Sequence, residues 1–444
     1  MAGPAIRVWN MADQLIERCD VRIVSWRRIE RTSARWELAY VHESDDRAMS
    51  LHERWADVII VQGMALRVFP SIACTDKIVV VDLYDPFQLE QLEQNKFEER
   101  ALWTDEIRKA VSVLNEQLVR GDFFICASER QRDLWLGSLS SVGRLNPATY
   151  TDDPTFSSLI GIVPFGLPPE RPTQTRHAIK GTVNGIGPDD TVLLWGGGIY
   201  NWFDPVTLVE AMGVLQDTRP DIKLFFLSAR HFDPQVPEME VLADTVGAAE
   251  RLGLLDKTVF FNDSWVDYDD RVNYLLDADL GVSTHPVHAE TRFSFRTRIL
   301  DYLWAGLPVV TSDGDSFADI VGASGAGAVV APNDAGALAE AIRDLLETPG
   351  RLDDARDAVA RTREQFEWPT TLRPLVDFCA APHHAADYAD RRDKRSSERF
   401  DRILGMPSGR RRDLALLLYY LRRGGPALAR RKLTERRGRL SADD

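Results

Sequence analysis

Short runs of β-branched and aromatic residues alternate with helical segments along most of the chain, and this alternation limits the possible folds more than any other feature. In the first half the strand-like runs are Val21–Trp26, Asp57–Gln62, Lys77–Leu83, Asp122–Ala127 and Leu159–Phe165. In the second half they are Thr191–Trp195, Ile222–Leu227, Thr258–Phe261, Leu280–Ser283, Pro308–Thr311 and Ala328–Val330. Strands that alternate with helices predict parallel sheets covered by helices. We therefore expect an α/β protein with two doubly wound domains in tandem.

The boundaries of these domains follow from breaks in the alternation. A chain of 444 residues is too long for one hydrophobic core. Gly166 to Pro169 interrupts the pattern, and Pro172 to Lys180 has the composition of a linker. We expect an N-terminal Rossmann-like domain over residues 1–172, a second Rossmann-like domain over residues 181–378, and a helical basic tail over residues 379–444.

The first domain begins without the strand that should precede its first turn. Gly3 lies in a strand-to-helix turn, and a helix follows through about Arg18. Either the sequence starts downstream of the true start, which we favour, or the sheet lacks a strand that is usually central. A missing strand would leave edge groups unpaired and expose a hydrophobic seam.

Composition excludes several classes of protein. The hydrophobic share of 44% and the charged share of 27% are ordinary for a globular protein. The four cysteines lack the spacing of a metal site or a disulfide framework. We find no apolar run long enough to cross a membrane and no signal-peptide pattern, so a cytoplasmic protein is expected.

Charge is distributed unevenly between the body and the tail. The whole chain carries a net charge of −14, whereas residues 387–444 contain 17 Lys and Arg against 9 Asp and Glu. An acidic body argues against nucleic acid as the partner. The apolar run from Asp413 to Tyr420 is flanked by arginines, which is typical of an element that lies on an anionic membrane surface. The alternative is a solvated helix that packs on the body.

The stretch from Ser283 to Ser312 holds the densest set of candidate functional residues. After the strand Leu280–Ser283 comes a polar loop with His285, His288, Glu290 and Arg292. A helix is expected from Ser294, its N-cap, to Gly306, where a left-handed residue would end it. A helix start binds anions, because its N–H groups are free and the helix dipole is positive there.

Three charged side chains lie in the first turns of this expected helix. Arg296 and Arg298 could meet phosphates; being two residues apart they point to different faces, and Arg296, in the first turn, is the stronger candidate. Asp301, two turns into the helix, could accept hydrogen bonds from sugar hydroxyls. Such an arrangement suggests a site for a sugar nucleotide. The alternative for each residue is a solvated charge on a helix surface.

A glycine-rich loop occurs earlier in the same domain. The strand Thr191–Trp195 runs into Gly196, Gly197 and Gly198, and a helix begins after Asp204, with Asp204 as its N-cap. Consecutive glycines allow backbone N–H groups to approach a phosphate closely. The pattern is not GxGxxG and no acid follows at the distance required for a dinucleotide ribose, so NAD binding is disfavoured.

These features together resemble the GT-B glycosyltransferases, specifically family 4. The motifs that carry the resemblance are Gly3-Pro4-Ala5-Ile6-Arg7, Asp82-Leu83-Tyr84-Asp85-Pro86, Gln131-Arg132-Asp133-Leu134-Trp135, Pro164-Phe165-Gly166-Leu167-Pro168, Gly196-Gly197-Gly198 and the run from Ser294 to Tyr302. The resemblance implies a retaining, metal-independent transferase of envelope or capsular polysaccharide synthesis, without a cofactor. Its substrates would be a nucleotide-diphosphate sugar and a glycan or lipid-linked acceptor.

The resemblance also implies roles for individual residues. Catalytic roles are expected for Glu290 and Asp85. Residues expected at the nucleotide sugar are Gly197, Gly198, Arg230, Ser294, Phe295, Arg296, Arg298, Asp301, Gly3 and Arg7.

The sequence departs from the family pattern in the spacing of its acids and in its basic residues. The family has two glutamates separated by seven residues; Asp301 matches the second, but the first position is Phe293 and the nearest acid is Glu290. Tyr200-Asn201-Trp202-Phe203 replaces the usual basic pair after the glycine loop, so Arg296, Arg298, Arg230 or Arg7 would have to neutralise the diphosphate.

Three alternatives stay open at this stage. The sequence Asp313-Gly314-Asp315 has the form of a DxD metal motif, but its domain already offers backbone and arginine groups to a phosphate, so no metal is expected. A nucleotide-sugar 2-epimerase of related fold would release free nucleotide without an acceptor. A non-catalytic protein that binds sugar nucleotides or acts as a scaffold is the third reading.

Overall fold

The computed structural model describes residues 3–29, 31–228, 239–264, 266–392, 412 and 414–421. The chain forms two compact units. The larger unit comprises Met1–Leu145 and Thr155–His383, and it contains both predicted sheet regions. The smaller unit comprises Asn146–Pro154 and His384–Asp444.

Strands of the N-terminal half form two parallel sheets instead of the single sheet that alternation suggested. β1 (Arg22–Ser25) pairs with β2 (Glu37–Tyr40), whereas β3 (Val58–Val61), β4 (Ile78–Asp82), β5 (Phe123–Cys126) and β6 (Ile160–Ile162) form a sheet in the order β3-β4-β5-β6. β2 was missed by the sequence analysis. Among the described residues β1 and β3 are therefore both edge strands.

Burial in these strands reflects their positions in the sheets. In β4, Val79, Val80 and Val81 are completely buried, as strands covered on both faces by helices should be. In the edge strand β3, Val58, Ile59 and Ile60 are only half-buried. The hydrophobic core of this half is consequently centred on β4 and β5, whose carboxyl ends carry Asp82 and the loop that follows it.

The C-terminal half contains one parallel sheet of six strands in the order β12-β11-β10-β7-β8-β9. Its strands are β7 (Thr191–Trp195), β8 (Ile222–Phe226), β9 (Val259–Phe261), β10 (Leu280–Ser283), β11 (Val309–Ser312) and β12 (Gly327–Val330). From β7 the chain adds β8 and then β9 on one side. It then returns to the other side of β7, where β10, β11 and β12 follow in turn. In open sheets of this kind ligands bind at the carboxyl ends of the strands where this reversal occurs. That point lies between the glycine loop after β7 and the polar loop after β10.

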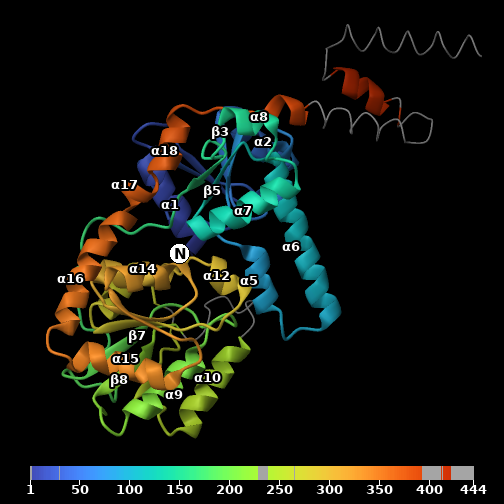
Figure 1. Cartoon of the computed structure of the whole chain (residues 1–444). Helices are drawn as coiled ribbons and strands as arrows, with labels where there is room; N and C mark the ends of the chain where they lie inside the picture. The colour runs from blue at the N-terminus through green and yellow to red at the C-terminus, as the bar shows by residue number, and fades with distance from the viewer. Residues whose placement is uncertain are drawn as a thin grey trace, which may run out of the picture. The chain divides into compact units, whose positions relative to one another are not determined.

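Helices connect the strands in both halves (Figure 1). In the N-terminal half they are α1 (Gly3–Leu15), α2 (Asp46–Trp55), α3 (Ala65–Val68), α4 (Pro70–Ala73), α5 (Phe87–Gln94), α6 (Arg100–Arg120) and α7 (Glu129–Ser141). In the C-terminal half they are α9 (Pro205–Leu215), α10 (Glu240–Arg251), α11 (Arg271–Leu275), α12 (Ala289–Phe293), α13 (Thr297–Ala305), α14 (Ser316–Ser324), α15 (Ala335–Glu347) and α16 (Arg351–Arg363). After α16 come a 3₁₀ turn (Glu364–Phe366), α17 (Trp368–Thr371) and α18 (Arg373–Ala380).

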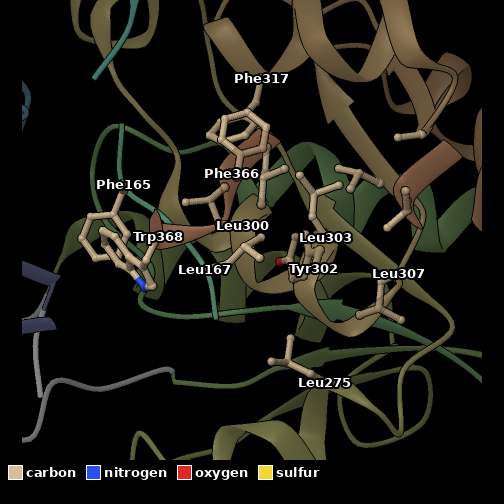
Figure 2. Close-up of a cluster of buried hydrophobic side chains, with 14 of the residues drawn as sticks. Phe165, Leu167, Leu275, Leu300, Tyr302, Leu303, Leu307, Phe317, Phe366 and Trp368 are labelled. Atoms are coloured by element: carbon tan, nitrogen blue, oxygen red, sulfur yellow. The ribbon is translucent and has the colours of Figure 1, made fainter. Parts of the chain in front are cut away.

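The two halves are joined by packing as well as by the chain. The backbone of Leu167 exchanges hydrogen bonds with Phe366 and Trp368, at 2.9 and 3.0 Å. Figure 2 shows Phe165 beside Trp368, and Phe317 beside Phe366, next to the buried face of α13. A Cβ atom on Gly166 would lie 2.6 Å from the Trp368 ring, so the predicted break at Gly166 is a tightly packed crossing.

Little of the basic tail lies within the described residues. Asn146 caps α8 (Pro147–Asp152) in the smaller unit, and residues 414–421 are helical. In that helix Leu414, Leu418 and Leu421 are exposed, whereas Leu416 and Tyr419 are buried. The flanking Arg410, Arg411, Arg422 and Arg423, which carried the membrane expectation, lie outside the described residues. Within the described part, none of the helices is both long and apolar enough to cross a bilayer.

Candidate active site

The helix that carries the predicted anion site begins two residues later than expected, with Arg296 and not Ser294 at its N-cap position. α12 (Ala289–Phe293) precedes it, and the His288 side chain caps α12 by accepting from the Thr291 N–H at 3.1 Å. The Ser294 hydroxyl donates backwards to the Thr291 carbonyl, and α13 starts at Thr297. The prediction that Ser294 is an N-cap was therefore wrong, because the preceding short helix uses its hydroxyl. The predicted end is confirmed, since Gly306 is left-handed with φ of 79°.

Arg298 is a buried cation without a carboxylate partner in the described part of the chain. The residue is 9% exposed, and its Nη2 donates to the Gly198 carbonyl at 2.8 Å. Its guanidinium lies over the rings of Phe203 and Trp195, at 3.9 and 4.3 Å from their centroids. Nη1 has no hydrogen-bond partner among the described residues. Burial lowers the pKa of Arg298 to about 10, so the side chain stays charged at neutral pH.

Such a cation is costly unless an anion compensates it. Burying an ionised group without a charged partner opposes folding by several kcal/mol, of order 3–5. Arg298 lies in the first turn of α13, where the helix dipole favours a negative ligand, and contacts the glycine loop. Its free Nη1 and the backbone of the glycine loop together form a candidate anion receptor.

Arg296, which the sequence analysis ranked higher, is already neutralised. It forms a bidentate pair with Glu290, at 2.8 and 2.7 Å, and its Nε lies 3.7 Å from Asp315. Both Glu290 and Arg296 are buried, at 1% and 5% exposure. Arg298 is thus the stronger candidate for an anion, since it is the one of the two without a carboxylate partner among the described residues. Glu290, expected to act near the transferred sugar, instead holds Arg296.

Tyr302 fixes the glycine loop against the sheet, a role that the sequence analysis did not assign. Its hydroxyl accepts from the Gly196 N–H at 2.7 Å and lies 2.9 Å from the carbonyl oxygens of Leu194 and Val282. A Cβ atom on Gly281 would lie only 2.3 Å from the Tyr302 ring, so a glycine in β10 makes room for it. Gly197 has φ of 97°, which favours glycine.

Replacing Tyr302 by Phe should weaken the protein and its ligand binding together. The Gly196 N–H would lose a buried acceptor, which costs about 1–3 kcal/mol. Because burial raises the pKa of the Tyr302 hydroxyl to about 12, the loss should be the same at pH 6 and pH 9. Thermal unfolding and nucleotide titration measure the two effects. Tyr40→Phe, at an exposed tyrosine, serves as the control; a Tyr302→Phe protein with unchanged unfolding temperature would contradict the assigned role.

Asp301 lies on α13, and one of its two carboxylate oxygens is hydrogen-bonded. Its Oδ1 accepts from Nε and Nη2 of Arg271, both at 3.2 Å, and 38% of its side chain is exposed. Arg271 in turn lies over the Tyr268 ring. No described residue bonds to Oδ2, so the predicted ribose contact would be made by that oxygen, with Arg271 orienting the carboxylate.

Among the other residues predicted to bind the nucleotide sugar, Arg7 and Phe295 contact groups inside the protein. Arg7 is 0% exposed; it pairs with Asp82 at 2.7 Å and donates to the Val163 and Pro164 carbonyls. The N–H groups of Arg7 thus have acceptors inside the protein, and its predicted contact with a substrate phosphate stays a prediction. Phe295 packs between Phe317 and Phe366. Gly3 opens α1, with open space where a Cβ would lie. Arg230 lies outside the described residues.

The loop after β4 places further acids beside the site. Asp85 is half-buried, and burial together with the charges of Glu290 and Asp82 raises its pKa to about 7. Burial, followed by the charges of Asp85 and Glu290, also raises the pKa of Glu90 on α5. The sequence analysis proposed Asp85 but missed Glu90, because the spacing of five residues across a loop and a helix start has no recognisable pattern.

The residues that resembled a metal motif have another role. Asp315 is completely buried, caps α14 by accepting from the Ala318 N–H at 2.8 Å, and lies 3.3 Å from Nε2 of His285. His285, Arg296 and the Ala318 N–H keep the pKa of the Asp315 carboxyl low despite its burial.

His288, at the start of α12, lies within 3.8 Å of Glu93 and 3.7 Å of Glu290, and burial lowers its pKa.

Comparisons with known proteins show which family this part of the chain is similar to. The sequence model of the glycosyl transferases of group 1 matches residues 190–348, which hold the glycine loop, Arg298 and Asp301. These residues, called the group 1 domain below, are similar to that family. A curated relative, D-inositol 3-phosphate glycosyltransferase 2 of Catenulispora acidiphila, is 28% identical over 207 residues. That alignment covers 47% of this chain and 46% of the relative, so the chain spans about half the length of the curated relative.

Solved structures share the arrangement of both halves. Sucrose-phosphate synthase from Thermosynechococcus elongatus has a TM-score of 0.59 at 16% identity, over 85% of this chain and 93% of that one. HepE of Anabaena, in complex with UDP-glucose, has a TM-score of 0.60 at 14% identity, over 86% and 96%. Identities this low show the fold alone. The group 1 domain and the half that precedes it therefore have the GT-B architecture.

Proposed function

We propose that this group 1 glycosyl transferase moves a sugar from a nucleotide-diphosphate sugar to a glycan or lipid-linked acceptor. The observation that carries the proposal is Arg298, a buried cation with a free Nη1, at the first turn of α13 and against the glycine loop. A diphosphate is an anion of the right chemistry to compensate it. The complex of HepE with UDP-glucose supports a donor of this class.

The residues of the site suggest how the transfer proceeds. As the glycosidic bond breaks, negative charge grows on the leaving diphosphate. Arg298 and the N–H groups of the glycine loop and of α13 are fixed before the reaction, so they stabilise that charge without reorganising. Asp301, oriented by Arg271, would hold the ribose. We propose a metal-independent reaction on this basis, and retention of configuration because the sequence resembles retaining transferases.

The biological setting is proposed in the same way. An enzyme that uses glycan or lipid-linked acceptors would take part in polysaccharide or cell-envelope synthesis, on the cytoplasmic side of a membrane. The exposed Leu414, Leu418 and Leu421 next to a basic sequence support peripheral contact with an anionic bilayer surface.

Release of nucleotide distinguishes transfer from the alternatives. UDP-, GDP- and dTDP-sugars are incubated with the protein, with and without a panel of glycoside and lipid-linked acceptors. We expect free nucleoside diphosphate to appear from one donor and to rise with an acceptor. Equal release without any acceptor would favour an epimerase, and nucleotide binding without release would favour a binding protein; either result would contradict the proposed transfer.

A further inference from the structure

The turn that follows the glycine loop has a buried polar residue in its middle. The Phe203 N–H donates to the Tyr200 carbonyl at 2.9 Å, which closes a turn with Asn201 and Trp202 at its centre. Asn201 is only 6% exposed, so its amide group needs hydrogen-bond partners inside the protein. Those partners show what the turn is attached to.

The Asn201 side chain joins the ends of two helices from different halves of the chain. Its Nδ2 donates at 3.1 Å to the carbonyl of Gln94, the last residue of α5 in the N-terminal half. Its Oδ1 accepts at 3.4 Å from the N–H of Val241, in the first turn of α10 in the C-terminal half. Helix ends leave such carbonyl and N–H groups without a partner in their own helix. One side chain therefore caps both helices.

A second hydrogen bond from the N-terminal half reaches the backbone of the same residue. Lys96, two residues past the end of α5, donates to the Asn201 carbonyl at 3.0 Å and pairs with Glu93 of α5 at 3.1 Å. The helix α5 also lies next to α12 of the group 1 domain (Figure 1). The N-terminal half thus holds the turn by two hydrogen bonds, one to the side chain and one to the backbone of Asn201.

The same turn holds the buried cation of the site. The guanidinium carbon of Arg298 lies 3.9 Å from the centroid of the Phe203 ring, and its Nη2 donates to the carbonyl of Gly198, before the turn, at 2.8 Å. Glycines have no side chains that could pack, so the position of the glycine loop depends on contacts at its ends. Tyr302 fixes the first glycine, and Asn201 fixes the turn at the other end.

We infer that Asn201 is a positioning residue for the diphosphate, and that α5 acts on Arg298 through it. Lys96 has its hydrogen bonds to Asn201 and Glu93, so its effect on the guanidinium would pass through the turn. The inference rests on the proposed function and adds to it a contribution of the N-terminal half to donor binding. The alternative is that these bonds only join the two halves and leave the anion receptor unaffected.

Nucleotide titration of Lys96 variants tests the inference from the N-terminal half, with UDP, GDP and dTDP and their monophosphates. Lys96→Met keeps the apolar stem but loses the donor to the Asn201 carbonyl. We expect its dissociation constant for the diphosphate that binds the wild type to rise about three- to tenfold. The constant for the matching monophosphate should stay within about twofold, because the second phosphate is the group that meets Arg298. Lys96→Arg keeps a donor and should recover most of the affinity, and Lys109→Met, at an exposed lysine of α6, is the control.

Two further variants test the route of the effect. Asn201→Ala removes both helix caps and should lower the preference for diphosphate over monophosphate in the same way. In a protein that already carries Arg298→Gln, Lys96→Met should cause no further loss of diphosphate affinity, because both changes act on one contact. Additive losses would contradict the inference.

The outcomes separate this inference from the proposed function. If none of the three diphosphates binds the wild type, the proposed function fails and the inference fails with it. If one of them binds, and Lys96→Met and Asn201→Ala bind it as tightly as the wild type, only the inference fails. It fails too if affinity for the monophosphate falls as much as affinity for the diphosphate, which is what a general weakening of the fold would cause.

Discussion

Replacing Glu290 by Ala should destabilise the group 1 domain more than any other single change at the site. Arg296 would remain buried at 5% exposure, with only Asp315, 3.7 Å away, as its partner. Breaking one side of a buried ion pair costs about 3–5 kcal/mol, which corresponds to roughly 6–20 °C in the unfolding temperature of a domain of this size. Thermal unfolding followed by circular dichroism measures the shift.

Two further variants make this prediction specific. Glu340→Ala removes an exposed glutamate from a helix of the same domain and should shift the unfolding temperature by less than about 2 °C. The double variant Glu290→Leu/Arg296→Met removes both charges, so it should recover most of the loss. If Glu290→Ala alone unfolds at the wild-type temperature, the pair does not hold the site together. An unrecovered double variant would show that packing, and not the unpaired charge, dominates.

Replacing Arg298 by Gln should have opposite effects on ligand binding and on stability. Loss of a charge-assisted hydrogen bond costs about 1.5–3 kcal/mol, so affinity for the nucleoside diphosphate should fall roughly 10- to 150-fold. The unliganded protein should not become less stable, because a buried cation without a counter-charge is removed. Calorimetric titration and thermal unfolding of the same samples report both effects.

Matched arginine variants separate charge from geometry. Arg292→Gln, at an exposed position on α12, should leave affinity and stability unchanged. Arg298→Lys keeps the charge but cannot reach both the Gly198 carbonyl and a phosphate, so an intermediate affinity is expected. Wild-type affinity in Arg298→Gln would place the diphosphate elsewhere. A large loss of stability in that variant would mean that Arg298 is a structural residue.

Most of the fold could be predicted because hydrophobic periodicity determines it locally. β7 and β10 occur at the predicted residues, Thr191–Trp195 and Leu280–Ser283, since a buried parallel strand is a continuous apolar run. β2 was missed because both ends of Glu37–Tyr40 are exposed and the strand lacks such a run. The separation of β1 and β2 from β3 could not be predicted, because tertiary contacts decide which strands pair.

The site was less predictable, because its chemistry depends on pairings between distant residues. Arg296 and Arg298 are nearly equivalent in sequence, and only the fold shows that Glu290 neutralises Arg296. Arg7 has a partner 75 residues away in Asp82, which no local pattern reveals. Tyr302 was part of a recognised motif, but its three backbone partners come from two strands and a loop. Spacing identifies which residues carry charge; it does not identify which charges remain uncompensated.

The central claim is that Arg298 and the glycine loop receive the diphosphate of a sugar nucleotide. Calorimetric titration of the wild-type protein with UDP, GDP and dTDP, each compared with its monophosphate, tests this most directly. We expect one diphosphate to bind about tenfold or more tightly than its monophosphate, because the second phosphate would be the group that meets the free Nη1 of Arg298. Equal affinity for monophosphate and diphosphate, or no binding of any of the three diphosphates, would contradict the claim.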